Sequence, residues 1–109
     1  MSEAYRNARQ AVGTSLAAVY TCPANTKAVV IGCQAANVDG TNAADLSLAW
    51  TDDSDSDALT YLVKTVTIPP DAAFNPIGGP LVLEAGDQLQ ALASAAGDLE
   101  LSLSVLEIS

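Results

Sequence analysis

Residues 78–94 read Gly78-Gly79-Pro80-Leu81-Val82-Leu83-Glu84-Ala85-Gly86-Asp87-Gln88-Leu89-Gln90-Ala91-Leu92-Ala93-Ser94. A Gly-Gly-Pro break precedes a short apolar run, and Ala85-Gly86-Asp87 separates this run from a second, alternating one. Glycine adopts positive φ without a Cβ clash, and aspartate caps turns through its carboxylate. The segment therefore predicts two strands joined as a β-hairpin, and other parts of the chain repeat this pattern.

Alternation of apolar and polar residues with a period of two recurs along the chain. It is clearest in 45–51, where Leu46, Leu48 and Trp50 share one parity, and in 99–105. Such alternation predicts half-buried antiparallel strands. Further strands are predicted at 14–21, 27–37 and 59–68, which are separated by segments rich in Pro, Gly, Asn and Asp. With about seven strands and no predicted helix, the fold class is all-β, an antiparallel β-sandwich of jelly-roll or Greek-key type.

Three strands depart from simple alternation. The run Val29-Val30-Ile31 is apolar on both parities, which predicts a strand covered on both faces. The apolar residues of 59–68 have mixed parity, which predicts a β-bulge or two-sided burial. At Leu106 the apolar parity of the last strand switches and Ile108 keeps the new parity, so this end is expected to bulge or to pair with another chain.

The length and composition predict one domain with a small core. The chain has 109 residues, of which 50% are hydrophobic but only 5% aromatic. Such a core consists mainly of Leu, Val and Ala. Residues 14–109 are assigned to the sandwich domain.

Residues 1–13 lack clean alternation and are predicted to form an extended N-terminal arm. Their large or basic side chains are Tyr5, Arg6 and Arg9. Tyrosine and arginine are enriched at the energetic centres of protein interfaces. We therefore expect the arm to bind a neighbouring subunit through these three residues, with a frayed terminus as the alternative.

The charge balance excludes two classes of partner. Four basic residues against thirteen acidic ones give a net charge of −9, made up of +1 in residues 1–9 and −10 in residues 10–109. Binding of nucleic acids and of anionic membranes depends on Lys and Arg, so neither is expected. No apolar run approaches the ~20 residues of a membrane span, and no signal-peptide pattern opens the sequence. The chain is therefore expected to be made in the cytoplasm or assembled there into a larger object.

The two cysteines are not expected to bond to each other. If residues 23–26 form a hairpin turn, Cys33 lies about six residues beyond the position opposite Cys22, which at ~3.3 Å per residue is roughly 20 Å. Bridged Cα atoms lie within ~7 Å of each other. We expect two small buried side chains, with a bond to another subunit as the alternative.

No catalytic or cofactor site is predicted. The sequence contains no histidine, which removes the usual general base and the commonest metal ligand. Asp53, Asp55 and Asp57 have the initial spacing of a calcium loop, but the later glycine and glutamate are missing, so a solvated acidic loop is expected and weak calcium binding stays open. For a carbohydrate-binding sandwich, the one candidate aromatic pair is Trp50 with Tyr61.

Four segments together resemble the small β-sandwich structural proteins of tailed bacteriophages. They are Ala17-Ala18-Val19-Tyr20-Thr21-Cys22-Pro23-Ala24-Asn25-Thr26, Ala36-Asn37-Val38-Asp39-Gly40-Thr41-Asn42, Leu48-Ala49-Trp50-Thr51-Asp52 and Gly79-Pro80-Leu81-Val82-Leu83-Glu84-Ala85-Gly86-Asp87. The resemblance covers roughly residues 14–108, and it is one of turn and strand style rather than a diagnostic motif.

The resemblance implies a non-enzymatic virion protein without a cofactor. It would be a capsid decoration (cement) protein that bridges neighbouring subunits, or alternatively a neck, tail or baseplate component. Its partners would be the major capsid protein or other virion proteins and further copies of itself, and it would be located in the virion after assembly in the bacterial cytoplasm. The Pro-rich and Thr-rich arm of better-known cement trimers is missing here.

Overall fold

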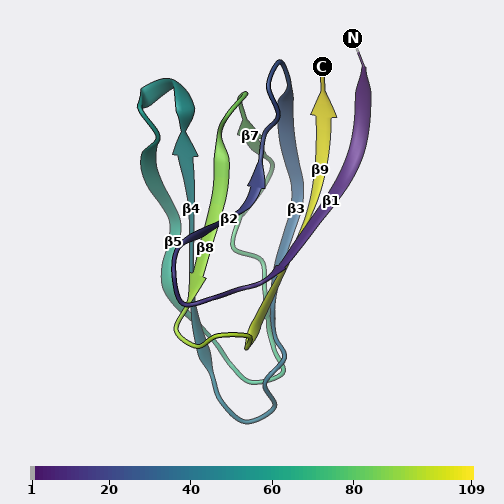
Figure 1. The fold of residues 1–109 in the computed structure, drawn as a ribbon. Helices are drawn as coiled ribbons and strands as arrows, with labels where there is room; N and C mark the ends of the chain where they lie inside the picture. Colours follow the sequence, from purple (N-terminus) through teal and green to yellow (C-terminus); the bar gives the residue numbers. More distant parts are fainter. Residues whose placement is uncertain (1) are drawn as a thin grey trace.

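The computed structural model describes residues 2–109, and its strands form two antiparallel sheets (Figure 1). Nine strands are present: β1 (Glu3–Ala11), β2 (Ala17–Thr21), β3 (Lys27–Asn37), β4 (Ala44–Asp52), β5 (Ala58–Ile68), β6 (Ala73–Phe74), β7 (Leu81–Leu83), β8 (Gln88–Ala93) and β9 (Leu99–Ile108). One 3₁₀ turn, η1 (Asp53–Asp55), lies between β4 and β5. The predicted all-β class is confirmed.

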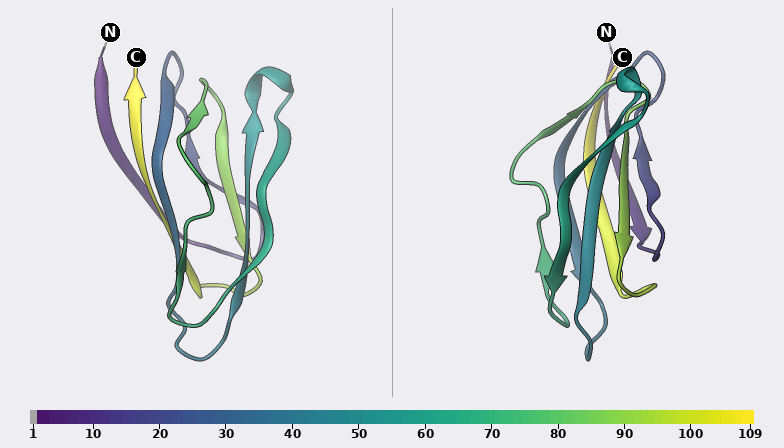
Figure 2. Two further views of the ribbon diagram at one scale, coloured as in Figure 1. Left: turned by 180° about the vertical axis from the view of Figure 1, so that it is seen from behind. Right: turned by 90° about the vertical axis from the view of Figure 1, so that its left-hand side faces the viewer.

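The strand order defines a jelly roll. One sheet, sheet A, has the order β1-β9-β3-β6, with β7 also pairing with β3, and the other, sheet B, has the order β2-β8-β4-β5. If β6 and β7 are treated as one interrupted strand, each sheet has four strands, as in the double-sheet jelly roll. Figure 2 shows the two sheets from behind and from the side.

Leucines from both sheets fill the space between them. The inward positions of β9, namely Leu99, Leu101, Leu103 and Val105, are at most 2% exposed. They face leucines and alanines of β4 and β8, of which Leu46, Leu48 and Leu89 are fully buried. The alternation in the sequence therefore corresponds to an inward and an outward face, as predicted.

The turn at 84–87 does not form the predicted hairpin. β7 pairs with β3 in sheet A, whereas β8 pairs with β2 and β4 in sheet B, so the turn connects the two sheets. Residues 23–26 likewise join β2 of sheet B to β3 of sheet A. In both places the chain reverses where the sequence predicts a turn. The flanking strands, however, face each other across the core and do not pair.

The hairpin of β4 and β5 contains the predicted irregularity of residues 59–68. The register of the two strands shifts between Leu46 and Leu48 and again between Leu48 and Ala49. Thr65 has φ of 51°, and its N–H donates a hydrogen bond to the buried Ser47 Oγ at 3.0 Å. Mixed parity in this strand therefore reflects β-bulges, as expected.

The N-terminal segment is a strand of sheet A. Residues 3–11 pair with β9 in unbroken register, from Glu3 opposite Ile108 to Ala11 opposite Glu100. Val12, directly after β1, is buried at 1% exposure and donates its N–H to Leu99 O. The expected division into an arm at 1–13 and a domain at 14–109 therefore differs from the structure, in which the segment belongs to the sandwich. Met1 of the predicted arm lies outside the described residues.

Candidate functional site

β1 forms a long free edge of sheet A, and the three residues predicted to bind a partner all lie on it. β1 pairs only with β9, so its other side has no strand partner among residues 2–109. Tyr5 and Arg9 are opposite Leu106 and Ser102, on the outer face of the sheet, and Tyr5 is 77% exposed. Arg6 is opposite the buried Val105 and therefore lies on the inner face. The strand thus places Tyr5 and Arg9 on the same face, four residues apart, and Arg6 on the other face.

Arg6 belongs to a polar network that links the two sheets. Its Nε lies 3.3 Å from Oε1 of Glu107 on β9, and the hydroxyl of Tyr20 on β2 donates to Oε2 of the same carboxylate. Burial, followed by the hydrogen bond to Glu107, raises the pKa of Tyr20 above its ordinary value. The network holds the β1 edge of sheet A against the β2 edge of sheet B. Nothing in the sequence pairs Tyr20 with Glu107, because the two residues are 87 positions apart.

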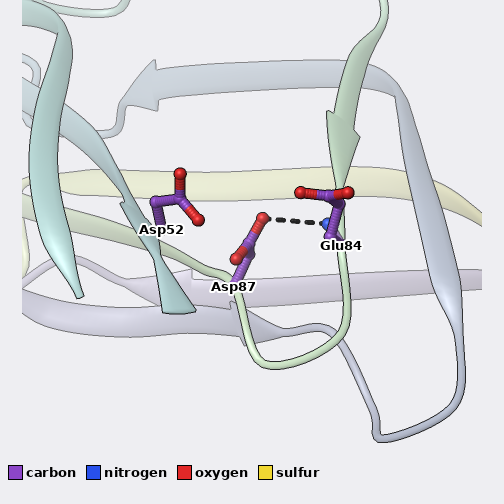
Figure 3. A group of neighbouring side chains, drawn as sticks. All are labelled: Asp52, Glu84 and Asp87. Atoms are coloured by element: carbon purple, nitrogen blue, oxygen red, sulfur yellow. Dashed lines mark hydrogen bonds between the residues drawn. The ribbon is translucent and has the colours of Figure 1, made fainter. Parts of the chain in front are cut away.

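The acidic residues that come together are not those with calcium-loop spacing. Carboxylate oxygens of Asp52, Glu84 and Asp87 lie within 4.8 Å of one another (Figure 3). Over residues 2–109, no other group of three acidic or cysteine side chains is this close. Asp53 and Asp55 lie in η1, and Asp57 follows it with φ of 59°.

Hydrogen bonding accounts for the position of Asp87 in this cluster. Its side chain is buried, with 2% exposure, and its two oxygens accept the backbone N–H groups of Asp53 and Glu84, each at 2.9 Å. Gly86 in the same turn has φ of 88° and donates its N–H to Cys22 O. The carboxylate therefore joins the 84–87 turn to η1, which is a structural role.

Both cysteines are free and enclosed by the protein. Cys22 is 1% exposed and donates its thiol to Thr26 O, and Cys33 is 5% exposed. Burial raises the pKa of the Cys33 thiol to about 12 and also raises the pKa of Cys22. Protonated, buried thiols are poor nucleophiles, so neither cysteine is placed for catalysis or for a bond to another subunit.

The two aromatic residues considered for sugar binding lie on opposite faces of sheet B. Trp50 is opposite Leu89, which is fully buried, and packs against the core. Tyr61 is opposite Ala49, the neighbour of Trp50 in β4, and therefore lies on the outer face. The two rings cannot form a common stacking platform.

No protein-family model matches the sequence, and no curated protein matches it significantly. Several solved structures match the fold. One is from "Bacillus endospore appendages form a novel family of disulfide-linked pili", with 10% identity, a TM-score of 0.58 and coverage of 99% of this chain and 87% of that one. Two more are a pentameric capsid protein from metagenomic phage sequences (17% identity, TM-score 0.44, 94% of this chain and 60% of that one) and a chain of infectious bursal disease virus, Gt strain (10%, 0.37, 98% and 30%).

The similarity to the Bacillus appendage protein extends over nearly the whole chain and shows a shared fold. The class of this protein is thus an antiparallel jelly-roll sandwich. Residues 2–109 contain no helix long and apolar enough to cross a bilayer.

Proposed function

We propose that this chain is a non-enzymatic structural protein of a phage virion, acting as a capsid decoration protein that bridges neighbouring subunits of the shell. The observation that carries the proposal is the free β1 edge. It is nine residues long and bears Arg6 and Arg9 on a protein whose net charge is −9. An open edge of this length is a template for main-chain pairing with another protein.

The chemistry of the chain supports a binding role over a catalytic one. The sequence has no histidine, and its two thiols are buried with raised pKa values. In the acidic cluster, both carboxylate oxygens of the buried Asp87 are already occupied by backbone N–H groups. What the protein offers to a partner is its outer surface.

In the proposed contact, the exposed side of β1 pairs with the main chain of a shell subunit. Tyr5 and Arg9 then lie on one face of the extended sheet, where a ring and a guanidinium supply side-chain anchors. Arg6 stays with Glu107 and keeps β1 in its own sheet. An acidic surface on the shell subunit is the complement that Arg9 would select.

Particles of the source phage, purified on a density gradient, provide the test. We expect mass spectrometry to find the chain in high copy number, and recombinant chain to rebind shells from which it has been stripped. The combined variant Tyr5→Ser and Arg9→Ser should weaken rebinding by about tenfold or more. Lys64→Ser is the matched control, because Lys64 is an exposed basic residue on β5, at the opposite edge of the sandwich.

Copy number distinguishes the two virion roles. A few copies per particle that remain with isolated tails favour the alternative, a neck, tail or baseplate component. Purified particles that lack the chain altogether refute the virion assignment.

A further inference from the structure

The outer face of sheet A carries an apolar patch at the end where the two termini lie. Strand register places Tyr5 of β1 beside Leu106 of β9, Leu106 beside Val29 of β3, and Val29 beside Val82 of β7. These four side chains form one row across four strands. Ile31 and Ile108 flank the row. We call these six residues the outer patch: Tyr5, Val29, Ile31, Val82, Leu106 and Ile108.

The exposure of the outer patch is uneven. Leu106 and Val29 are half-buried by their neighbours in the row, as cross-strand pairs normally are. Tyr5, Val82 and Ile31 are 77%, 60% and 51% exposed. Pairing within the sheet therefore accounts for the centre of the row but leaves its ends in water.

Further along the same face, the outward positions are polar or small. On β9 they are Ser104, Ser102 and Glu100, and on β3 they include Gln34. The outer patch is thus a local apolar area on an otherwise hydrophilic face. It also accounts for the parity switch at Leu106, because β9 pairs with β1 without a register shift there. Leu106 and Ile108 simply point outward.

We propose that the outer patch, apart from Val82 at its end, is covered by a second copy of this chain, packed face to face about a two-fold axis that runs along β9. A two-fold contact places the same patch on both subunits. With the axis along β9, Leu106 and Ile108 meet their own counterparts, and Tyr5 on β1 lies across from Val29 of the partner subunit. Aligned packing of two sheets about 10 Å apart has this geometry.

Charge is what identifies a second copy as the occupant. Glu3 and Lys27 are both opposite Ile108, on the two strands that flank β9, so they lie on either side of the proposed axis on the outer face. The ion pair that residues 2–109 contain is Arg6 with Glu107, so neither Glu3 nor Lys27 has a partner there. The two-fold operation exchanges β1 and β3 across the interface. It therefore brings Glu3 of each copy opposite Lys27 of the partner subunit.

The contact is expected to be weak in solution. The row spans about three strand spacings of ~4.8 Å, well below the size of a standard stable interface. We expect a dissociation constant on the order of 100 μM, which many copies on one particle would reinforce through avidity. This inference rests on the proposed structural role, which supplies that high local concentration.

Sedimentation equilibrium of the full chain over about 10 μM to 1 mM tests the contact. We expect a monomer–dimer equilibrium that Leu106→Thr weakens by about tenfold, from the loss of buried apolar surface. Val29→Thr is the second, milder variant, in case Leu106→Thr loses stability, because Val29 lies across from Tyr5 of the partner subunit. The matched control is Ser102→Thr, on the same face of β9 but outside the outer patch, and it should leave the equilibrium unchanged.

Charge reversal tests the two-fold geometry itself. Glu3→Lys and Lys27→Glu should each weaken the dimer by about tenfold at low salt, because each places like charges across the interface twice. The double variant Glu3→Lys with Lys27→Glu should restore wild-type association. Failure of this rescue overturns the proposed orientation.

Two other results overturn the inference. One is a wild-type chain that stays monomeric over the whole concentration range. If Leu106→Thr nevertheless prevents this monomer from binding to stripped shells, a shell protein covers the outer patch in place of a second copy. The other is a dimer unaffected by Leu106→Thr and Val29→Thr. Neither result bears on whether the chain is found in purified particles, so this inference and the proposed function can fail separately.

Discussion

At the scale of single residues, the 84–87 turn shows how local chemistry fixes a chain reversal. Gly86 has φ of 88°, and a Cβ at this position would lie 2.6 Å from Cγ of Asp53. Asp87 accepts the N–H groups of Glu84 and Asp53. The glycine and the aspartate were recognisable in the sequence. Their contact with η1, which is more than thirty residues away, was not.

Gly86→Ala should therefore destabilise the fold by more than Gly97→Ala. Both glycines have positive φ, at 88° and 79°, but Gly97 has no atom within 4 Å of an added Cβ. The conformational cost of about 1 kcal/mol is common to both, and Gly86→Ala adds a clash that we expect to cost about 1–2 kcal/mol more. Urea unfolding measures both variants. Equal losses would show that Asp53 moves aside freely.

Both thiols should resist modification in the folded protein. Burial raises the pKa values of Cys22 and Cys33, and exposures of 1% and 5% limit access of a reagent. We expect 5,5′-dithiobis(2-nitrobenzoic acid) to react with two thiols in denaturant and with almost none under native conditions. Assembled material should also migrate as monomer on a non-reducing gel. A disulfide-linked ladder would contradict the burial.

Stability should fall in alkaline solution because of Tyr20. Burial and the bond to Glu107 raise the pKa of Tyr20 above its unfolded value of about 10. A raised pKa of this kind contributes stability that is complete below pH ~10 and is lost as the pH rises toward the folded value. Melting temperatures from pH 8 to 11 measure the effect. Tyr20→Phe should lower Tm at pH 8 and reduce the decline of Tm above pH ~10. If Tm of the variant declines as steeply as that of the wild type, another group is responsible for the decline.

At the scale of elements, β1 is where sequence and structure diverge most. Its residues show no apolar alternation because none of them is fully buried, and its inward positions include Arg6 and Gln10. Main-chain hydrogen bonds to β9 keep β1 in sheet A, and such pairing cannot be predicted from the hydropathy of the residues. The burial of Val12 anchors the strand at its end. An edge strand of this kind is indistinguishable from a free arm in a single sequence.

Deleting residues 2–12 should consequently lower the stability of the isolated protein. The deletion removes Val12 from the core and exposes the edge of β9. We expect a loss of at least about 2–3 kcal/mol, or about 10 °C in Tm. The variant Tyr5→Ser with Arg9→Ser, which changes only outward side chains of β1, should melt like the wild type. An unchanged Tm after the deletion would show that β1 is a detachable arm.

Strand identity was predictable, whereas strand partnership was not. The period-two pattern of β9 correctly predicted which of its side chains are buried between Leu99 and Val105. In β4 the pattern predicted the inward face, but Ser47, Ala49 and Thr51 on the other face are buried as well. Turn residues at 23–26 and 84–87 predicted reversals but could not distinguish a hairpin from a crossing between sheets. That choice depends on the long-range register of β3, β8 and β9, which local sequence does not determine.

At the scale of the whole molecule, the architecture could be predicted from the sequence, whereas the assembly surface could be predicted only in part. Alternation and turn spacing predicted the sandwich. Tyr5, Arg6 and Arg9 are exposed, and their binding to a partner stays a prediction. Two features of the sequence correspond to the outer patch: the switch of apolar parity at Leu106 and the run around Val30 that is apolar on both parities. Only the register across β1, β9, β3 and β7 shows that these residues form one surface.

The central claim, that this sandwich acts through its outer surface as part of a virion, is tested most directly by a cryo-electron microscopy map of the source particle. We expect the jelly roll in many symmetry-related positions on the outside of the shell, with the free side of β1 against a shell subunit. A complete map of the particle in which no density accommodates this fold would contradict it.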